Sequence, residues 1–133
     1  PRDKILEITS DCVVPAAIAE QINSGNVDKI NCKYVLEIAN SPIESGQDEV
    51  LEEKGIIIIP DIVANAGGII VSHFEWAQNL QGLRWKKANV LNLLKEKTTD
   101  AASQLLLISK KKKVSLPIAS QLMALDNIKA SLL

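Results

Sequence analysis

Three short apolar runs in the first half of the chain predict parallel strands. They cover residues 12–15, 34–38 and 56–60, and each consists mainly of consecutive apolar residues with little polar alternation. Such runs are typical of a parallel sheet that helices cover on both faces. We therefore expect both faces of these strands to be buried.

Segments with helical character separate the runs. The pattern predicts a short helix over residues 16–22 and a second helix over residues 45–54. Gly55, directly after the second helix, is a natural C′ residue. Strand, helix and strand at this spacing indicate right-handed βαβ crossovers. The first half therefore predicts an α/β fold.

After the third run, the pattern changes from strands to helices. A turn-rich passage is predicted over residues 61–68, then helices over 69–80 and 86–111, and a last helix with Ser115 as N-cap and Pro117 in its first turn. Apolar residues that recur at helical spacing in the two later helices are expected to face inward. They are Val90, Leu93, Leu94, Ala101, Leu105, Ile108, Ile118, Leu122, Leu125 and Ile128.

The 133 residues have the length of one domain, without repeats or a low-complexity linker. Three strands are too few for a free-standing doubly wound sheet, and the first would be an exposed parallel edge. The chain therefore looks like the second half of a Rossmann-type, three-layer domain over residues 1–133, with a strand and helix part (1–66) and a helical part (67–133). Because it opens on Pro1 rather than Met, we expect a segment of a longer protein.

Composition narrows the classes of function. The 15 Lys and Arg residues against 16 Asp and Glu residues give a net charge of −1, which argues against a nucleic-acid partner. No apolar run approaches the roughly 18 residues that cross a bilayer, and no signal peptide is evident. Cys12 and Cys32 match no zinc spacing and are expected to be buried, reduced thiols of a cytoplasmic protein, although a mitochondrial or plastid matrix also fits. With a single histidine, His73, no metal site is expected.

The stretch that follows the third run carries the strongest chemical signal. Gly67 and Gly68 stand just before a predicted helix, whose free N–H groups and positive dipole end suit a carboxylate or phosphate. Ser72 lies one turn further on and is placed to donate to the same anion, and Asn65 offers an amide donor and acceptor. The spacing equally fits a tight turn at the glycines and a serine bonded to its own backbone. Both interpretations stay open.

The ends of the first two strands carry a second signal. Asn40 lies at the carboxyl edge of the sheet, where open α/β folds bind ligands, and either contacts a ribose or amide or caps a turn. The small residues 15–17 either admit a flat cofactor or pack strand against helix. Convergence of three strand ends at one edge favours a shared site.

Three other features are expected to be structural. His73 is not expected to act as a general base, because its neighbour Ser72 points in a different direction on the helix. Trp76 is expected to pack. The basic run over residues 110–113 is expected to be a solvated cap at the negative end of a helix dipole, with phosphate binding as the alternative.

These segments resemble the glutamate dehydrogenase family, specifically the C-terminal half of its dinucleotide-binding domain. The motifs that carry the resemblance occur in the family's order and spacing, from about Asp11 onward. They are D-C-V-V-P-A-A (11–17), E-I-A-N-S-P (37–42), L-E-E-K-G (51–55), I-P-D-I-V-A-N-A-G-G (59–68) and S-H-F-E-W-A-Q-N-L-Q (72–81). The resemblance implies an oxidoreductase of amino-acid metabolism that uses NAD or NADP to convert glutamate into 2-oxoglutarate and ammonia.

The resemblance also implies roles for five residues. Asn40 and Asn65 would contact the nicotinamide end of the cofactor, and Ala17 would line the cofactor groove. Ser72 would bind the side-chain carboxylate of glutamate, with Ile69 beside it. Relatives that act on leucine, valine or phenylalanine tend to have an apolar residue at the position of Ser72, so the resemblance favours a dicarboxylic substrate. The catalytic residues and the glycine-rich loop are expected upstream of this chain. Relatives are commonly hexamers, which implies a homo-oligomer.

Two positions depart from the family's usual E-G-A-N-G-P. Ile38 adds bulk near the cofactor edge, and Ser41 restricts a turn, where the family has glycine at both places. An arginine common in the family's last helix is Pro117 here. A second interpretation therefore stays open, in which the chain is an isolated or diverged, non-catalytic half-domain that acts as a nucleotide-binding or assembly module.

Overall fold

The computed structural model describes residues 2–132, and the chain divides into two compact units. The sheet unit is Pro1–Asn65 and the helical unit is Ala66–Leu133. The sheet unit contains the 3₁₀-helices η1 (Arg2–Glu7) and η2 (Val27–Lys29), the strands β1 (Cys12–Val13), β2 (Tyr34–Leu36) and β3 (Ile57–Ile59), and the helices α1 (Gln47–Glu53) and α2 (Asp61–Ala64). The helical unit contains α3 (Gly67–Gln81), α4 (Lys87–Lys112) and α5 (Leu116–Ser131).

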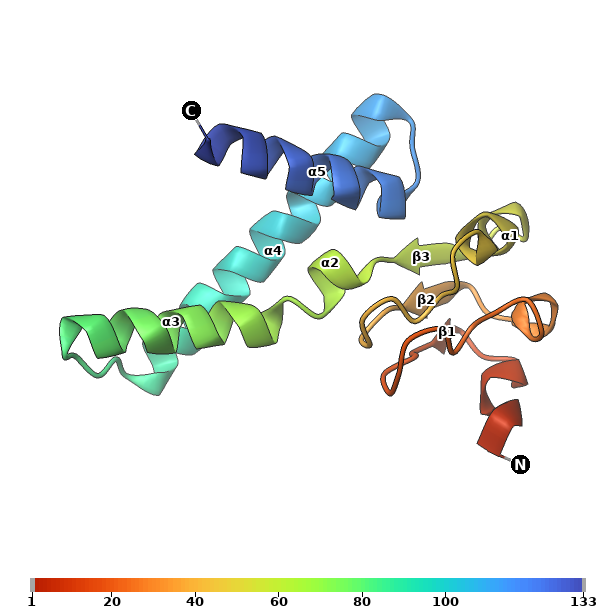
Figure 1. Cartoon of the computed structure of the whole chain (residues 1–133), viewed down its shortest axis with the longest axis horizontal. Helices are drawn as coiled ribbons and strands as arrows, with labels where there is room; N and C mark the ends of the chain where they lie inside the picture. Colours follow the sequence, from red (N-terminus) through yellow and green to blue (C-terminus); the bar gives the residue numbers. More distant parts are fainter. Residues whose placement is uncertain (1, 133) are drawn as a thin grey trace. The chain divides into compact units, whose positions relative to one another are not determined.

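The three predicted strands form one parallel sheet in the order β1-β2-β3, and they lie side by side in Figure 1. Val13, Val35 and Ile58 lie opposite one another in the register of the sheet. The α1 helix connects β2 to β3, as a parallel crossover requires. The α/β fold with three parallel strands and C-terminal helices is therefore confirmed.

Only one face of the sheet is buried. Val13, Val35 and Ile58 point into a core that also includes Ile22, Val27, Ile30, Leu51 and Ile56. On the other face, Tyr34 and Ile57 are 42% and 48% exposed. The expectation that both faces are covered is wrong for the described residues, because the crossover helix and loops of this unit supply apolar cover for one face only.

Buried and exposed side chains alternate along β1, so the prediction that both thiols are buried is wrong for Cys12. Cys12 precedes Val13 on β1 and lies on the exposed face, so it is not buried, whereas Cys32 is half-buried against the core. Both thiols are free. Burial raises the pKa of the Cys32 thiol above its ordinary value, so this side chain stays protonated more readily than an exposed thiol.

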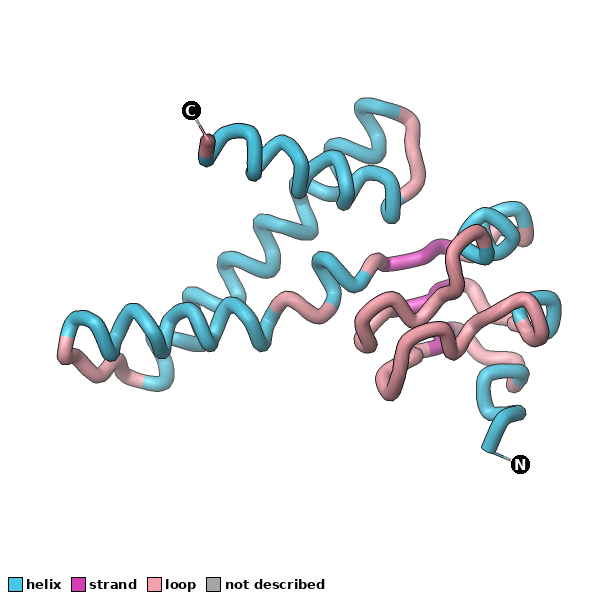
Figure 2. The backbone as a smooth tube through the Cα atoms, viewed as in Figure 1, coloured by secondary structure: helices cyan, strands magenta, loops and turns pink. Residues whose placement is uncertain are grey.

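The helix predicted over residues 16–22 is absent, and Figure 2 shows loop between β1 and η2. The side chain of Gln21 accepts the N–H of Ala17 at 3.3 Å, and Glu20 has a left-handed backbone with φ of +53°. Ile22 donates its N–H to Pro42 O at 3.0 Å and forms an isolated parallel bridge with Ile43. These contacts use the backbone groups that a helix would need, so the segment remains extended and turned.

The side chain of Lys54 connects the end of the crossover helix α1 to the segment around η2 through hydrogen bonds. Lys54 follows α1 directly, and Gly55 comes next with φ of +78°, as its predicted capping role requires. The Nζ of Lys54 donates to the carbonyl oxygens of Val27, Asp28 and Ile30 at 3.0, 2.8 and 2.8 Å. One ammonium therefore donates to three carbonyl groups at the end of η2, of which the Val27 carbonyl also accepts the N–H of Ile30 at 3.2 Å.

The passage predicted as turns is more helical than expected. Asp61–Ala64 form α2, and Gly67 and Gly68 lie in the first turn of α3 rather than before it. Neither glycine has a positive φ, so the tight-turn interpretation is wrong. At the other end, Gly82 stops α3 with a left-handed φ of +63°.

The helices of the helical unit pack α3 against α4 and α4 against α5. Gln78 joins α3 to the following loop, because its Oε1 accepts the N–H of Trp85 at 2.7 Å, and the Trp85 ring lies 5.8 Å from that of Phe74. Along α4, Leu105 is buried, and the other residues predicted to face inward are half-buried. No helix among residues 2–132 has the length and apolar content to cross a membrane.

The last helix uses a different face from the predicted one. Ile118, Leu125 and Ile128 are exposed, and Ala119, Ser120 and Met123 are buried instead. Apolar residues occur around the whole of α5, and small side chains allow the closest approach of two helices, so the Ala119 and Ser120 face makes the contact. Ser115 precedes the helix as predicted, but its side chain makes no capping hydrogen bond. Trp76 on α3 is also 58% exposed, so the prediction that it packs is wrong.

Candidate functional site

The carboxyl ends of the three strands are joined by hydrogen bonds. Pro15 O, after β1, accepts the N–H groups of Ile38 and Ala39 at 3.2 and 2.9 Å. Glu37, after β2, donates its N–H to Ile59 O at 3.1 Å. The predicted convergence of strand ends at one edge is therefore confirmed.

Two asparagines meet at this edge. Asn65 Nδ2 donates to Asn40 Oδ1 at 2.7 Å and lies 3.4 Å from Ile38 O. The bond joins residues that are 25 positions apart in sequence. We call these two side chains the amide pair. Ala17, the third residue predicted to bind the cofactor, is exposed in the loop after β1.

Asp61 and Glu37 form a network beside the amide pair. The N–H of Asp61 donates to Glu37 Oε2 at 2.9 Å, and Asp61 Oδ2 accepts the N–H of Ser41 at 2.8 Å. Glu37 is only 8% exposed, although it directly follows an apolar strand. The motifs of the sequence assign neither carboxylate a role. The available signals were the glutamate at a buried strand end and the aspartate at the first position of a helix.

The environment of Glu37 favours its protonated form. Burial raises the pKa of the Glu37 carboxyl, the hydrogen bond from the Asp61 N–H lowers it, and the negative charges of Asp61 and Asp48 raise it further. The net pKa lies above the ordinary value. A carboxyl of this kind binds protons more readily in the folded chain than in the unfolded chain, so its contribution to stability falls as the pH rises.

We expect Glu37→Gln to remove this pH dependence, because the amide keeps an oxygen that accepts the Asp61 N–H and never ionises. The stability advantage of the variant should grow as the pH rises from about 4 to about 7. Urea unfolding of both proteins at a series of pH values measures it. Glu53→Gln, at an exposed position on α1, is the matched control. Parallel stability curves for Glu37→Gln and the wild type would contradict the expectation.

Ser41 occupies a backbone conformation that favours glycine. Its φ is +45°, its N–H is bonded to Asp61, and its carbonyl oxygen accepts the N–H of Glu20 at 3.0 Å. These two bonds hold the turn in place, so a residue with a Cβ is strained there. The turn restriction inferred from the sequence is confirmed.

We expect Ser41→Gly to stabilise the protein by up to about 1 kcal/mol, because relief of the left-handed strain exceeds the added freedom of glycine in the unfolded chain. Thermal or urea unfolding measures the change. Ser45→Gly is the control, since Ser45 is exposed and has no positive φ. A loss of stability in Ser41→Gly equal to that of the control would show that the turn carries no strain.

The two residues predicted to bind substrate lie together on α3. Ile69 and Ser72 are three positions apart, so they share a face of the helix, and both are exposed, Ile69 by 75%. Other helical serines bond to their own backbone, as Ser103 does to Thr99 O at 2.8 Å. Within residues 2–132, no such bond is found for Ser72. Its hydroxyl is therefore available to a ligand.

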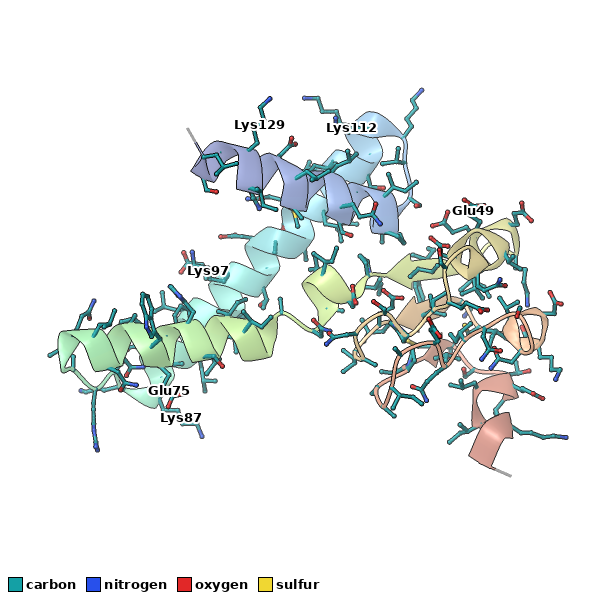
Figure 3. The ribbon with its side chains drawn as sticks, viewed as in Figure 1. Glu49, Glu75, Lys87, Lys97, Lys112 and Lys129 are labelled. Carbon is teal, nitrogen blue, oxygen red and sulfur yellow. The ribbon has the colours of Figure 1, made fainter. Side chains whose placement is uncertain are left out.

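His73 and the basic run lie at exposed positions of the helical unit. The His73 ring is exposed on α3 and lies 5.6 Å from the ring of Trp76. Lys110, Lys111 and Lys112 form the last turn of α4, and the Lys112 side chain extends away from the ribbon in Figure 3. This arrangement fits the interpretation of the run as a solvated cap.

A parallel sheet with polar side chains gathered at its carboxyl edge defines a Rossmann-like α/β unit. The comparisons with known proteins identify the family. The model of the Glutamate/Leucine/Phenylalanine/Valine dehydrogenase family matches residues 1–132, and the chain belongs to this family. This confirms the resemblance drawn from the motifs.

The chain is similar to a glutamate dehydrogenase of Thermotoga maritima, with 38% identity over 126 residues that cover 95% of this chain and 30% of the relative. It is equally similar to an NADP-specific glutamate dehydrogenase of a Synechocystis species, at 38% identity over 94% of this chain and 29% of the relative. Its fold matches the hetero-hexameric glutamate dehydrogenase of Thermus thermophilus in its leucine-bound form, with a TM-score of 0.91 at 19% identity over 96% of this chain and 30% of that one. The chain thus spans about 30% of the length of the curated relatives that it matches.

Proposed function

We propose that this chain is part of an enzyme that oxidatively deaminates L-glutamate to 2-oxoglutarate and ammonia with NAD or NADP. The observation that carries the proposal is the amide pair at the carboxyl edge of the sheet, in a chain of the dehydrogenase family. The names of the curated relatives support the substrate and the type of cofactor. The groups that perform proton transfer belong to the rest of the enzyme.

The chemistry of the amide pair fits a nicotinamide. The bond between Asn65 Nδ2 and Asn40 Oδ1 leaves Asn65 Oδ1 and Asn40 Nδ2, one acceptor and one donor, for a third amide. A nicotinamide carboxamide needs such a complementary pair. When bound, the cofactor supplies the hydride acceptor for the oxidation. Asn40 and Asn65 hold the ring in one orientation, and the small side chain of Ala17 leaves room for a flat group after β1.

Ser72 and Ile69 are proposed to select the substrate. The Ser72 hydroxyl donates a hydrogen bond to the distal carboxylate of glutamate, and Ile69 packs beside the aliphatic part of the substrate. Both side chains are exposed near the N-terminal end of α3, where the helix dipole favours a negative charge. A valine at position 72 would offer no donor and would favour an apolar substrate.

The working protein is proposed to be a homo-oligomer in a reducing compartment, the cytoplasm. The Thermus relative is described as hetero-hexameric, which supports assembly of several subunits. Free Cys12 and Cys32 support the reducing compartment.

Titration with NADH, followed by its fluorescence, tests the cofactor role of the amide pair. We expect the full-length protein to change the fluorescence on binding, and Asn65→Ala to weaken binding by about tenfold, because it removes the hydrogen bond to Asn40 and one contact to the nicotinamide. Asn92→Ala, at an exposed position on α4, is the matched control. Equal affinities of the two variants for NADH would show that the amide pair does not bind the cofactor.

A non-catalytic half-domain is the second candidate function. Ile38 favours it, because this branched side chain is 38% exposed at the edge where the cofactor would lie. The intact mass of the purified polypeptide separates the two candidates. A mass far above 14.5 kDa, together with glutamate-dependent reduction of NAD(P), supports the dehydrogenase, whereas a mass of 14.5 kDa without this activity supports the half-domain.

A further inference from the structure

Asp61 bonds to the backbone beside Asn40 and to the backbone of Asn65, the two residues whose side chains form the amide pair. Its carboxylate accepts the N–H of Ser41, the residue directly after Asn40, at 2.8 Å. Its carbonyl oxygen accepts the N–H of Asn65 at 3.1 Å. The bond between the two asparagine side chains thus closes a ring of contacts that begins and ends at Asp61.

The position of Asp61 is itself fixed by a buried group. Its N–H donates to Glu37 Oε2 at 2.9 Å, and Glu37 is only 8% exposed. Asp61 is also the first residue of α2, a helix of only four residues that leads directly to Asn65. A shift of Asp61 would therefore move Asn65 at the end of α2.

The turn that carries Asn40 needs hydrogen bonds from other residues to keep its conformation. Ser41 is exposed and strained at φ of +45°, so the turn that presents Asn40 would relax without its partners. The bond from the Ser41 N–H to the Asp61 carboxylate connects the strained residue of this turn to the first residue of α2. Both asparagines thus depend on one carboxylate residue that contacts neither side chain directly.

We propose that Asp61, anchored by Glu37, is a positioning residue that sets the geometry of the Asn40 and Asn65 side chains and thereby the use of the cofactor. The link to the cofactor rests on the proposed function. The geometric part stands on the four hydrogen bonds alone.

Kinetics of the full-length enzyme test the link to the cofactor. Asp61→Ala should lower kcat/KM for NAD(P) by about tenfold and leave the KM for glutamate within about twofold. Asp61→Asn keeps an oxygen that accepts the Ser41 N–H and should restore most of the loss. Asp11→Ala is the control, because it removes an exposed carboxylate that pairs with Lys33 at 2.8 Å elsewhere in the sheet unit.

The combination of variants separates positioning from a general structural role. In an Asn40→Ala, Asn65→Ala background, Asp61→Ala should change kcat/KM for NAD(P) by less than about twofold, since the groups through which it acts are gone. A full additional loss in that background, or an equal fall in every kinetic parameter, overturns the proposal. Melting temperatures of all variants exclude unfolding as the cause.

A crystal structure of full-length Asp61→Ala tests the geometry without any ligand. We expect the bond between Asn65 Nδ2 and Asn40 Oδ1 to be broken, while Asp61→Asn keeps it. An unchanged amide pair in Asp61→Ala overturns the positioning role. A broken pair in an enzyme whose cofactor kinetics do not respond to Asn40→Ala confirms the positioning and rejects the cofactor role of the pair instead.

Discussion

Ser72→Val in the full-length enzyme is expected to lower kcat/KM for glutamate by roughly 30-fold to 100-fold, because a carboxylate of the substrate loses a hydrogen-bond donor and meets a methyl group instead. The melting temperature should not change, since Ser72 is exposed on α3 and its hydroxyl bonds to no described residue. Steady-state kinetics with glutamate and with leucine measure the effect. The ratio of the two activities should shift toward leucine.

Two further variants make this result specific. Ser72→Thr keeps the hydroxyl and should retain more activity than the valine variant. Ser103→Val removes a helical serine that bonds only to Thr99 O on α4, so it should leave glutamate kinetics unchanged. If Ser72→Val turns over glutamate like the wild type, the serine does not bind the distal carboxylate.

Lys54→Met is expected to lower the free energy of unfolding by about 2 kcal/mol, the largest loss of stability among the substitutions considered. The methionine keeps most of the apolar stem but loses the ammonium that donates to Val27, Asp28 and Ile30. Urea unfolding measures the loss. Without this charged donor the carbonyl oxygens of Asp28 and Ile30 must find water, whereas Val27 O still accepts the N–H of Ile30. The bonds to Val27 and Ile30 are partly buried.

The control for Lys54 is another lysine of the sheet unit. Lys33→Met removes an ion pair with Asp11 in which both side chains are highly exposed, so we expect a loss of no more than about 0.5 kcal/mol. Lys54→Arg should fall between the two, because a planar guanidinium cannot reproduce three converging bonds. Equal losses for Lys33→Met and Lys54→Met would show that the three carbonyl contacts add nothing.

The sequence predicts the three strands of the sheet and the edge at which Asn40 and Asn65 lie. The apolar runs locate β1, β2 and β3 because parallel strands need such runs. The topology brings Asn40 and Asn65 to the same edge, since the ends of parallel strands share an edge, whereas their side-chain bond also depends on α2 and Asp61. The roles of these residues toward cofactor and substrate stay predictions.

Other features depend on contacts that no pattern reveals. The loop over residues 16–22 has helix-forming composition, yet Ile22 donates to Pro42 O the N–H that a helix would direct to Ile18 O. The choice of face on α5 depends on how closely Ala119 approaches its neighbour, not on the number of apolar residues. The role of Asp61 depends on the direction of one carboxylate toward Ser41, which spacing cannot indicate.

The long loops of the sheet unit have a consequence for the order of folding. Its defining contacts join distant residues, 27 positions apart for Lys54 and Val27 and 25 for Asn65 and Asn40, whereas α3, α4 and α5 consist largely of local contacts. Segments stabilised by local contacts fold faster than segments that must first close long loops. During refolding of the complete chain the helices are therefore expected to form early, and the edge that carries the amide pair is expected to be completed among the last steps.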